Sequence, residues 1–233
     1  MTEIPTQPVR DDVWVVIPAY KEASVIGTVV ADVARNCANI IVVDDASGDG
    51  TPEAAAQSGA IVVRHPINLG QGAALQTGIE LALEYGAQII VTFDADGQHH
   101  ASDIVALVEP LQDGRADFAL GSRFLGRSLN MPPSRRLLLQ AALLFTRITT
   151  RLRITDVHNG LRAMTRRGAQ AIQIRQNRMA HASEIMEQIA RSRLGYIEVP
   201  VTIEYTDYSM AKGQRMSNSL SILVDLFAGR LQR

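Results

Sequence analysis

The chain has 233 residues, of which 46% are hydrophobic and 20% are charged, and its formal net charge is −1 at pH 7. This length and composition are typical of one globular domain with a substantial core. The near-neutral charge gives no support to nucleic acid as a partner. The single cysteine, Cys37, excludes an intramolecular disulfide and a cysteine-based zinc cluster, and it suits a reducing cytoplasm. No stretch reaches the roughly 18 consecutive apolar residues expected of a membrane span.

Strand-like and helix-like segments alternate from residue 13 to about residue 123. Short apolar runs rich in β-branched residues predict strands, and apolar residues at helical spacing predict the helices between them. The predicted strands cover residues 13–17, 40–43, 60–63, 89–93 and 118–120, and the predicted helices cover residues 24–36, 73–85 and 102–111, with a short helix before the third strand. This alternation predicts an α/β fold with a mostly parallel central sheet and flanking helices.

The pattern changes after Gly126. The sequence predicts a long helix over residues 134–152, a loop or short strand pair over 155–164, a helix over 181–193 and a β segment over 197–205. Residues 1–12 are polar and predict a flexible N-terminal tail. Residues 206–233 predict a mobile loop followed by a C-terminal amphipathic helix, which leaves 13–205 as the catalytic domain. The apolar stripe of that last helix has three possible interpretations: a homodimer face, a membrane contact or core packing.

Four of the predicted strands end in polar residues. The groups are Pro18, Tyr20 and Glu22 after the first strand, Asp44 and Asp45 after the second, Asp94, Asp96 and Gln98 after the fourth, and Arg123 after the fifth. The carboxyl ends of parallel strands meet at one edge of a sheet, where ligands bind in open α/β folds. We therefore expect these side chains to converge on one site.

Asp94 and Asp96 are the strongest candidates for a metal site. Residues at i and i+2 on an extended segment point the same way, and Gln98 continues the series. Such an oxygen set suits Mg²⁺ or Mn²⁺ and leaves positions for the phosphates of a nucleotide. The alternative is an Asp-rich turn that caps the next helix.

The segment Asn68-Leu69-Gly70-Gln71-Gly72 resembles a phosphate-binding glycine loop, but it lacks the lysine of a Walker A motif. The first strand does not lead into Gly-x-Gly-x-x-Gly, so the dinucleotide-binding fingerprint is absent. The alternative is that these glycines let the chain enter the next helix.

Five motifs, taken together and in this order, resemble glycosyltransferase family 2. They are Val15-Val16-Ile17-Pro18-Ala19-Tyr20-Lys21-Glu22, Asp44-Asp45-x-Ser47-x-Asp49-Gly50-Thr51, Asn68-x-Gly70-x-Gly72, Asp94-x-Asp96-Gly97-Gln98 and Gly121-Ser122-Arg123. More narrowly, they are similar to the polyprenyl-phosphate branch, the dolichol-phosphate mannosyltransferase-like enzymes. The resemblance implies a GT-A (Rossmann-like) fold, a nucleotide diphosphate sugar as donor, Mg²⁺ or Mn²⁺ as cofactor, and inversion at the anomeric carbon.

The resemblance also implies roles for individual residues. The residues expected to bind the donor are Pro18, Tyr20, Glu22, Asp44, Asp45, Gln71, Asp94 and Lys212. The residues expected to bind the metal are Asp94, Asp96 and Gln98. Acceptor phosphate binding falls to Arg123, Arg135, Arg136 and Arg162, and the catalytic set is Asp96, Arg123, Asp156 and Glu184. Gln71 departs from the family, since many members carry a lysine there. Ser209-Met210-Ala211-Lys212 resembles a mobile loop that closes over the donor.

The nature of the acceptor decides whether a general base is needed. A phosphate nucleophile is already an anion, whereas a hydroxyl acceptor needs a base, for which Asp156 and Glu184 are the candidates. The alternative for Asp156 is a helix or turn cap, and for Glu184 a solvated helix charge. The histidines His99, His100, His158 and His181 do not have the spacing of a metal site on one helix, and we expect loop or hydrogen-bonding roles for them.

The predicted function is transfer of a hexose from a nucleotide diphosphate sugar to a polyprenyl phosphate at the cytoplasmic membrane face. The basic and apolar helix over 134–152 is either a core helix with basic ends or a surface that meets anionic lipid heads. Contact with the membrane is then peripheral or goes through a small membrane-protein partner. The alternatives are a family member that uses a sugar hydroxyl or a small phosphorylated acceptor, and a non-catalytic nucleotide-sugar-binding protein. A nucleotidyltransferase fits less well, because the basic glycine-rich loop it needs near the N-terminus is not seen.

Overall fold

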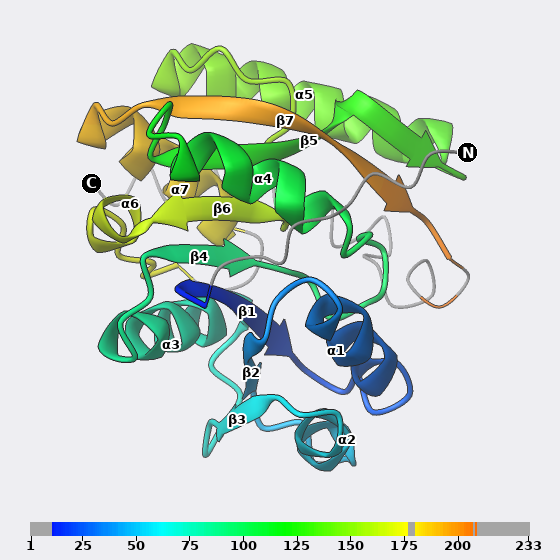
Figure 1. Cartoon of the computed structure of the whole chain (residues 1–233). Coiled ribbons are helices and arrows are strands. Elements are labelled where there is room, and N and C mark those ends of the chain that lie inside the picture. The colour runs from blue at the N-terminus through cyan, green and yellow to red at the C-terminus, as the bar shows by residue number, and fades with distance from the viewer. Residues whose placement is uncertain (1–10, 177–179, 207, 209–233) are drawn as a thin grey trace, which may run out of the picture.

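Seven strands of the described chain form one sheet in the order β3-β2-β1-β4-β6-β5-β7 (Figure 1). The computed structural model describes residues 11–176, 180–206 and 208. The strands are β1 (Val13–Ala19), β2 (Asn39–Asp44), β3 (Ile61–Arg64), β4 (Ile89–Thr92), β5 (Phe118–Leu129), β6 (Arg162–Thr165) and β7 (Tyr196–Glu204). Only β6 runs antiparallel to its neighbours, β4 and β5. The predicted mostly parallel sheet is therefore confirmed.

Helices cover both faces of the sheet (Figure 1). They are α1 (Ile26–Ala34), α2 (Thr51–Gln57), α3 (Gln71–Glu84), α4 (Asp103–Gln112), α5 (Pro133–Thr150), α6 (Arg166–Gln170) and α7 (Ala180–Ser192). The apolar residues of α1 and α4 pack in one core layer, and those of α3 and α7 pack in the other. The described helices thus enclose the sheet in a three-layer α/β arrangement.

The strand β1 shows how the sequence builds the two layers. Val13, Val15 and Ile17 belong to the layer beneath α1, whereas Val16 belongs to the layer beneath α3. Successive side chains of a strand point to opposite faces, so an unbroken apolar run fills both layers at once. This is why the strand reads as continuously hydrophobic.

The sheet departs from the prediction at β5 and β6. The expected strand over 118–120 continues to Leu129, so Arg123 lies inside β5 and does not follow it. The pairing register with β7 shifts between Ser122 and Arg127. A Cβ on Gly126 would stand 2.2 Å from the carbonyl oxygen of Val201, so this glycine permits a close approach between strands instead of marking a turn.

The predicted loop or strand pair over 155–164 contains one short strand, β6, inserted between β4 and β5. The five residues of α6, which directly follow β6, were not predicted. The predicted helices over 24–36, 134–152 and 181–193 are observed as α1, α5 and α7, with bounds that differ by one or two residues. The N-terminal tail, the loop with Lys212 and the C-terminal helix lie outside the described residues, apart from a few residues next to the domain.

Candidate active site

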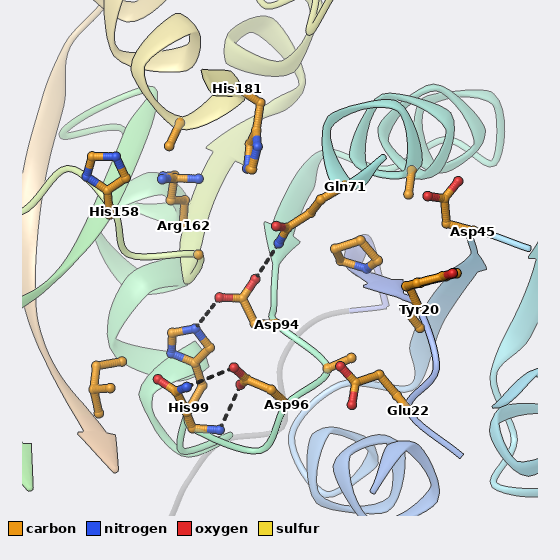
Figure 2. Close-up of a pocket in the computed structure, with 18 of the residues that line it drawn as sticks. Tyr20, Glu22, Asp45, Gln71, Asp94, Asp96, His99, His158, Arg162 and His181 are labelled. Atoms are coloured by element: carbon orange, nitrogen blue, oxygen red, sulfur yellow. Dashed lines mark hydrogen bonds and ion pairs between the residues drawn. The ribbon is translucent and has the colours of Figure 1, made fainter. Parts of the chain in front are cut away.

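One cavity of about 320 Å³ lies at the carboxyl ends of β1, β2 and β4, and β5 contributes to its wall (Figure 2). We call it the strand-end cavity. The predicted site residues that line it are Pro18, Tyr20, Glu22, Asp45, Gln71, Asp94, Asp96, Gln98, Arg123, Arg135 and Arg162. The expected convergence of polar strand ends is therefore observed, whereas the role of each residue stays a prediction.

Asp94 lies at the centre of the strand-end cavity (Figure 2). Its Oδ1 accepts a hydrogen bond from Nε2 of Gln71 at 3.1 Å, and its Oδ2 lies 3.0 Å from Nε2 of His99. Burial alone would raise the pKa of Asp94, but the His99 contact and the nearby positive charge of Arg162 lower that pKa below its usual value. Asp94 is therefore held as a carboxylate.

Asp96 follows two residues later and has a different environment. Its two oxygens accept hydrogen bonds from the backbone N–H and from Nε2 of Gln98, at 3.1 and 2.9 Å. Burial and the neighbouring charge of Asp94 raise the pKa of Asp96 to about 6. Gln98 thus supports Asp96 directly, and its predicted contact with a metal stays a prediction.

The two carboxylates fit a divalent cation. Both are oxygen ligands of the type that Mg²⁺ and Mn²⁺ prefer, and their mutual repulsion would be relieved by a positive charge. Within the described residues no group of three or more acidic, histidine or cysteine side chains forms a metal cage. Mg²⁺ commonly binds through one or two carboxylates and completes its shell with water and substrate phosphate, which matches a two-carboxylate site beside an open cavity.

Asp45 organises the glycine loop at the entrance to α3. Its carboxylate accepts hydrogen bonds from the backbone N–H groups of Leu69 and Gly70, at 2.9 and 2.7 Å, and lies 2.8 Å from Nδ1 of His65. Gly70 has a φ of 95° directly before α3, a conformation that favours glycine. A Cβ on Gly72 would stand 2.1 Å from the carbonyl oxygen of Gln176. Gly70 thus serves the entry to the helix and Gly72 the close approach of residue 176, and the predicted phosphate contact of this loop stays a prediction.

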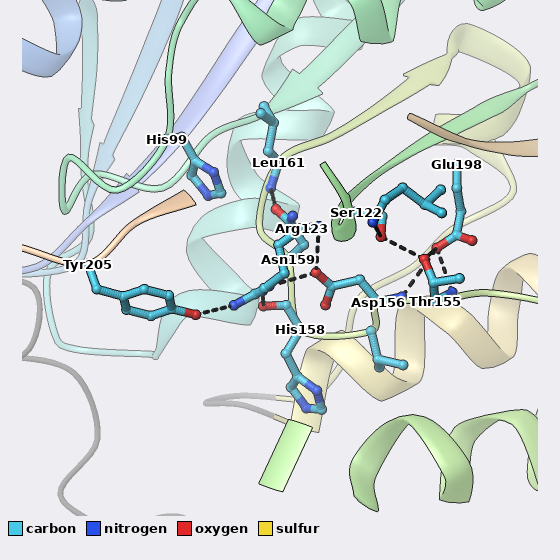
Figure 3. Close-up of polar contacts among 12 residues, drawn as sticks. His99, Ser122, Arg123, Thr155, Asp156, His158, Asn159, Leu161, Glu198 and Tyr205 are labelled. Carbon is cyan, nitrogen blue, oxygen red and sulfur yellow. Dashed lines mark hydrogen bonds and ion pairs between the residues drawn. The ribbon is translucent and has the colours of Figure 1, made fainter. Parts of the chain in front are cut away.

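Arg123, which also lines the cavity, has a dense set of contacts (Figure 3). Its Nε donates to Oδ2 of Asp156 at 2.6 Å, its Nη1 to the hydroxyl of Tyr205 at 2.7 Å, and its Nη2 to the carbonyl of His158 at 2.6 Å. Burial opposes its charge, but Asp156 and Tyr205 outweigh burial and raise the pKa of the guanidinium. Arg123 is therefore a fixed cation.

Two further arginines, Arg162 and Arg135, line the cavity. Arg162 is 3% exposed and donates to the carbonyl of Val157 at 3.0 Å. Burial lowers the pKa of Arg162 to about 10, which still leaves it charged at neutral pH. Arg135, on α5, places its guanidinium carbon 4.9 Å from the ring centroid of Tyr205. We call Arg123, Arg135 and Arg162 the acceptor-side arginines, after the role that the family resemblance predicts for them.

Four predicted residues do not line the cavity. Asp44 is fully buried and contacts Ser47 and Arg64, and Arg136 is exposed on α5. The two candidate bases, Asp156 and Glu184, are also absent from the lining. Lys212 lies outside the described residues.

Both candidate bases are held in structural contacts. Asp156 pairs with Arg123, and Oε2 of Glu184 accepts hydrogen bonds from the backbone N–H groups of Arg175 and Gln176, at 2.9 and 2.8 Å. Glu184 instead borders a second cavity, on the outer side of α7. Neither carboxylate lines the strand-end cavity, and the role of each as a base stays a prediction.

Three histidines that the sequence treats as loop residues also line the strand-end cavity: His99, His158 and His181. The ring nitrogens of His158 are buried and have no hydrogen-bond partner within the described residues. Burial lowers the pKa of His158 to about 4, so its imidazole is neutral at pH 7. No spacing signal could reveal these residues, because they come from three separate segments of the chain.

The comparison with protein families is consistent with this geometry. Residues 14–171 match the model described as glycosyl transferase family 2. A protein of Methanococcus voltae named UDP-N-acetylglucosamine–dolichyl-phosphate N-acetylglucosaminyltransferase is 32% identical, over 92% of this chain and 94% of its own length. A protein of Micrococcus luteus named undecaprenyl-phosphate mannosyltransferase is 31% identical, over 82% of each chain.

A solved structure shares the fold. Glucosyl-3-phosphoglycerate synthase from Mycobacterium tuberculosis, in complex with Mn²⁺, uridine diphosphate and phosphoglyceric acid, superimposes with a TM-score of 0.73 and 19% identity, over 93% of this chain and 77% of that one. The likeness concerns the fold, which is GT-A-like. No helix within the described residues is long and apolar enough to cross a membrane.

Proposed function

The chain belongs to glycosyltransferase family 2, and we propose that it transfers a hexose from a nucleotide diphosphate sugar to a polyprenyl phosphate, with inversion at the anomeric carbon. One observation carries the choice of acceptor. The acceptor-side arginines line one side of the strand-end cavity, and neither candidate base reaches it. A cavity lined by three arginines, with neither of the two predicted bases in its lining, suits a nucleophile that is already an anion.

The carboxylates of the cavity belong to its other side. Glu22, Asp45, Asp94 and Asp96 all follow β1, β2 or β4, whereas the acceptor-side arginines come from β5, α5 and β6. This separation of charge supports two subsites in one cavity, for the donor diphosphate with its cation and for the acceptor phosphate. A divalent cation bound by Asp94 and Asp96 would supply Lewis-acid stabilisation of the leaving diphosphate.

The chemistry then needs little from the protein beyond position and charge. An oxygen of the acceptor phosphate forms a bond to the anomeric carbon, and the bond from that carbon to the diphosphate oxygen breaks, with the electron pair leaving on the nucleoside diphosphate. Arg123 and its two companions hold the attacking phosphate and offset its charge. No proton has to be removed from the nucleophile, so Asp156 is free to serve as the partner of Arg123.

The named relatives support the same acceptor class. The Methanococcus voltae and Micrococcus luteus proteins are named for different sugars, but both names specify a polyprenyl phosphate as acceptor. The first name also specifies a UDP-linked donor. We therefore propose the acceptor class from the relatives and the cavity together, and leave the sugar to the donor screen below.

We further propose that α5 contacts the membrane surface that holds the acceptor. Leu137, Leu144 and Ile148 are 70%, 61% and 70% exposed and lie on one face of the helix. The helix contains three basic residues, Arg135, Arg136 and Arg147, and no acidic residue, and Arg151 directly follows it. An apolar stripe flanked only by positive charge fits an anionic lipid surface. Because Arg135 also belongs to α5, the same helix reaches from that surface to the cavity.

A matched set of acceptors tests the proposed function. The purified protein is incubated with Mg²⁺ or Mn²⁺ and labelled UDP- or GDP-hexoses, together with a short-chain polyprenyl phosphate, the corresponding polyprenol, or phosphoglyceric acid. We expect label to enter the organic phase only with the polyprenyl phosphate. Faster transfer to phosphoglyceric acid would select the small phosphorylated acceptor. Transfer to the polyprenol would select a hydroxyl acceptor, and donor binding without any transfer would select a non-catalytic binding protein.

A further inference from the structure

Tyr205 connects two of the acceptor-side arginines. It directly follows β7, is 3% exposed, and belongs to none of the motifs in the sequence. Its hydroxyl accepts a hydrogen bond from Arg123 at 2.7 Å (Figure 3), and its ring lies under the guanidinium of Arg135, 4.9 Å from centroid to Cζ. One side chain thus contacts a cation from β5 with its polar end and a cation from α5 with its aromatic face.

Arg123 depends on Tyr205 for its orientation. A guanidinium has five N–H donors, and Arg123 uses one on each of its three nitrogens, toward Asp156, Tyr205 and the carbonyl of His158. Contacts at all three nitrogens prevent the planar group from turning. Two donors, one on each terminal nitrogen, remain for a ligand. Loss of the Tyr205 hydroxyl would release one corner of this arrangement.

Arg135 depends on Tyr205 in a different way. Within the described part of the chain its guanidinium makes no hydrogen bond or ion pair, and its one aromatic contact is the ring of Tyr205. A cation over an aromatic face is attracted by the ring quadrupole and leaves all N–H donors available to a ligand. The ring therefore restrains Arg135 without consuming its hydrogen-bonding capacity.

The backbone fixes the position of Tyr205. Its N–H donates to the carbonyl of Leu129 at 3.1 Å, and Leu129 pairs in register with Glu204 at the ends of β5 and β7. The phenol is therefore attached to the strand that carries Arg123. The spacing between the two cations is set by this attachment and by the packing of α5.

We propose that Tyr205 is a positioning residue, which sets the spacing and orientation of Arg123 and Arg135 for the phosphate monoester of the acceptor. This inference rests on the proposed function, because it assigns the two arginines to the acceptor phosphate. It does not assign a direct contact between Tyr205 and the substrate.

Two substitutions separate the two contacts. Tyr205→Phe removes the hydroxyl and keeps the ring under Arg135, whereas Tyr205→Leu removes both. The KM and kcat for a short-chain prenyl phosphate are measured together with the Kd of that phosphate by calorimetry. We expect Tyr205→Phe to weaken acceptor binding about tenfold or more, as for loss of a hydrogen bond to a charged group. Tyr205→Leu should add about a three- to tenfold loss from the missing cation–π contact. The Kd of the nucleoside diphosphate should change by less than about twofold, since that ligand binds on the carboxylate side.

A matched control and a second background guard against a merely structural effect. Tyr196 lies at the start of the same strand, and its hydroxyl accepts a hydrogen bond from the N–H of Arg153 at 2.9 Å, away from the cavity. Tyr196→Phe should therefore lower thermal stability without changing the acceptor Kd. In an Arg123→Ala background, Tyr205→Phe should have almost no further effect on acceptor binding, because its action passes through Arg123.

The outcomes distinguish the two proposals. If the wild-type protein binds no prenyl phosphate, the proposed function fails, and the role of Tyr205 fails with it. If the wild-type protein binds the phosphate and Tyr205→Phe binds it equally well, the role of Tyr205 alone is overturned. The role of Tyr205 is also overturned if Tyr205→Phe weakens acceptor binding as much in the Arg123→Ala background as in the wild type. The same holds if Tyr205→Phe weakens nucleoside diphosphate binding as much as acceptor binding.

Discussion

His158 is a residue whose environment makes stability depend on pH. Both of its ring nitrogens are buried without a partner within the described residues, and Arg123 and Arg162 lie close enough to disfavour a proton on the ring. Burial first, and these two cations second, lower the pKa of His158 to about 4 from its ordinary value of 6.5. At acidic pH the unfolded state therefore binds a proton at His158 that the folded state does not bind, and this favours unfolding.

The sign of the effect follows from proton linkage. Between pH 6.5 and about 4 the unfolded chain binds a proton at His158 that the folded chain does not, so stability falls as the pH falls through this window. The shift corresponds to a loss of about 3 kcal/mol once the pH reaches 4. We expect His158→Phe, which cannot titrate, to lose less stability than the wild type between pH 7.5 and 4.5. Urea denaturation at several pH values measures the difference, and parallel curves for the two proteins would contradict it.

Asp156 has a structural contact that the sequence around it does not reveal. Its carboxylate is buried, and it holds the Nε and the backbone N–H of Arg123. Removing one partner of a buried pair leaves an uncompensated charge and costs about 3–5 kcal/mol. A structural duty of this kind is invisible in the sequence, because Asp156 and Arg123 lie 33 positions apart.

At the scale of elements, the segment before β6 meets the segment after β4. The carbonyl of Gly160 accepts a hydrogen bond from the hydroxyl of Thr92 at 2.6 Å. A Cβ on Gly160 would stand 2.0 Å from Oδ2 of Asp94, so only glycine permits this approach. The backbone of Gly160 therefore packs directly against the side chains of Thr92 and Asp94.

This contact predicts the effect of a single added methyl group. Gly160→Ala should displace the Asp94 carboxylate and reduce transfer by about 100-fold or more, as for misplacement of a catalytic group. Gly195→Ala is a suitable control, because a Cβ there would meet its nearest atom, Cα of Ala116, at an ordinary 3.5 Å. Turnover and thermal midpoints are measured for both variants. Unchanged turnover in Gly160→Ala would show that Asp94 is not held as the structure indicates.

The helix α5 carries the prediction for membrane contact. Leu144→Glu combined with Ile148→Glu should weaken binding to anionic vesicles at least tenfold, because two exposed apolar side chains would no longer enter the lipid interface. Ile67→Glu makes the same kind of change at a residue that is 63% exposed and lies outside α5, and it should leave vesicle binding unchanged. Co-sedimentation with vesicles measures both. If the double variant binds vesicles normally but loses dimers in light scattering, this face of α5 is a contact between copies of the chain.

At the scale of the whole molecule, ligand binding should stabilise a fold that does not itself require metal. Two apolar layers enclose the sheet, and Asp94 and Asp96 sit at its edge, outside both layers. We therefore expect a chelator alone to leave the thermal midpoint unchanged. A nucleoside diphosphate with Mg²⁺, at about 100 times its Kd, should add about 2.7 kcal/mol of stability. For a chain of this size that corresponds to roughly 5–10 °C in the midpoint.

The variant Asp96→Asn tests the metal assignment in the same experiment. It removes the repulsion between two partly buried carboxylates, so the free protein should be at least as stable as the wild type. The Mg²⁺-dependent gain from the nucleoside diphosphate should disappear, and transfer should be lost. A gain of the same size in wild type and variant would show that the assignment to Asp96 is wrong.

The order of strands and helices, the parallel sheet and the meeting of polar strand ends follow from local patterns in the sequence. Periodicity of two or of 3.6 residues reports burial directly, and parallel strands bring their carboxyl ends together wherever they are paired. Asp94, Asp96 and Arg123 could be placed in one site on this basis. The predicted strand over 118–120 stops before Gly121, whereas β5 continues through Gly121 and Gly126 to Leu129, because glycines at close packing and at turns leave the same signal in the sequence.

Only the tertiary structure decided what these residues do to one another. The hydrogen bond between Arg123 and Tyr205 joins residues 82 positions apart. The carboxylate of Glu184 binds the backbone N–H groups of residues 175 and 176 and does not line the cavity. The pairing of Asp156, the neutral ring of His158 and the ring of Tyr205 under Arg135 depend on the packing of β7, α5 and the segment before β6. Such contacts form between distant segments, and a linear pattern carries no information on the distance or direction between them.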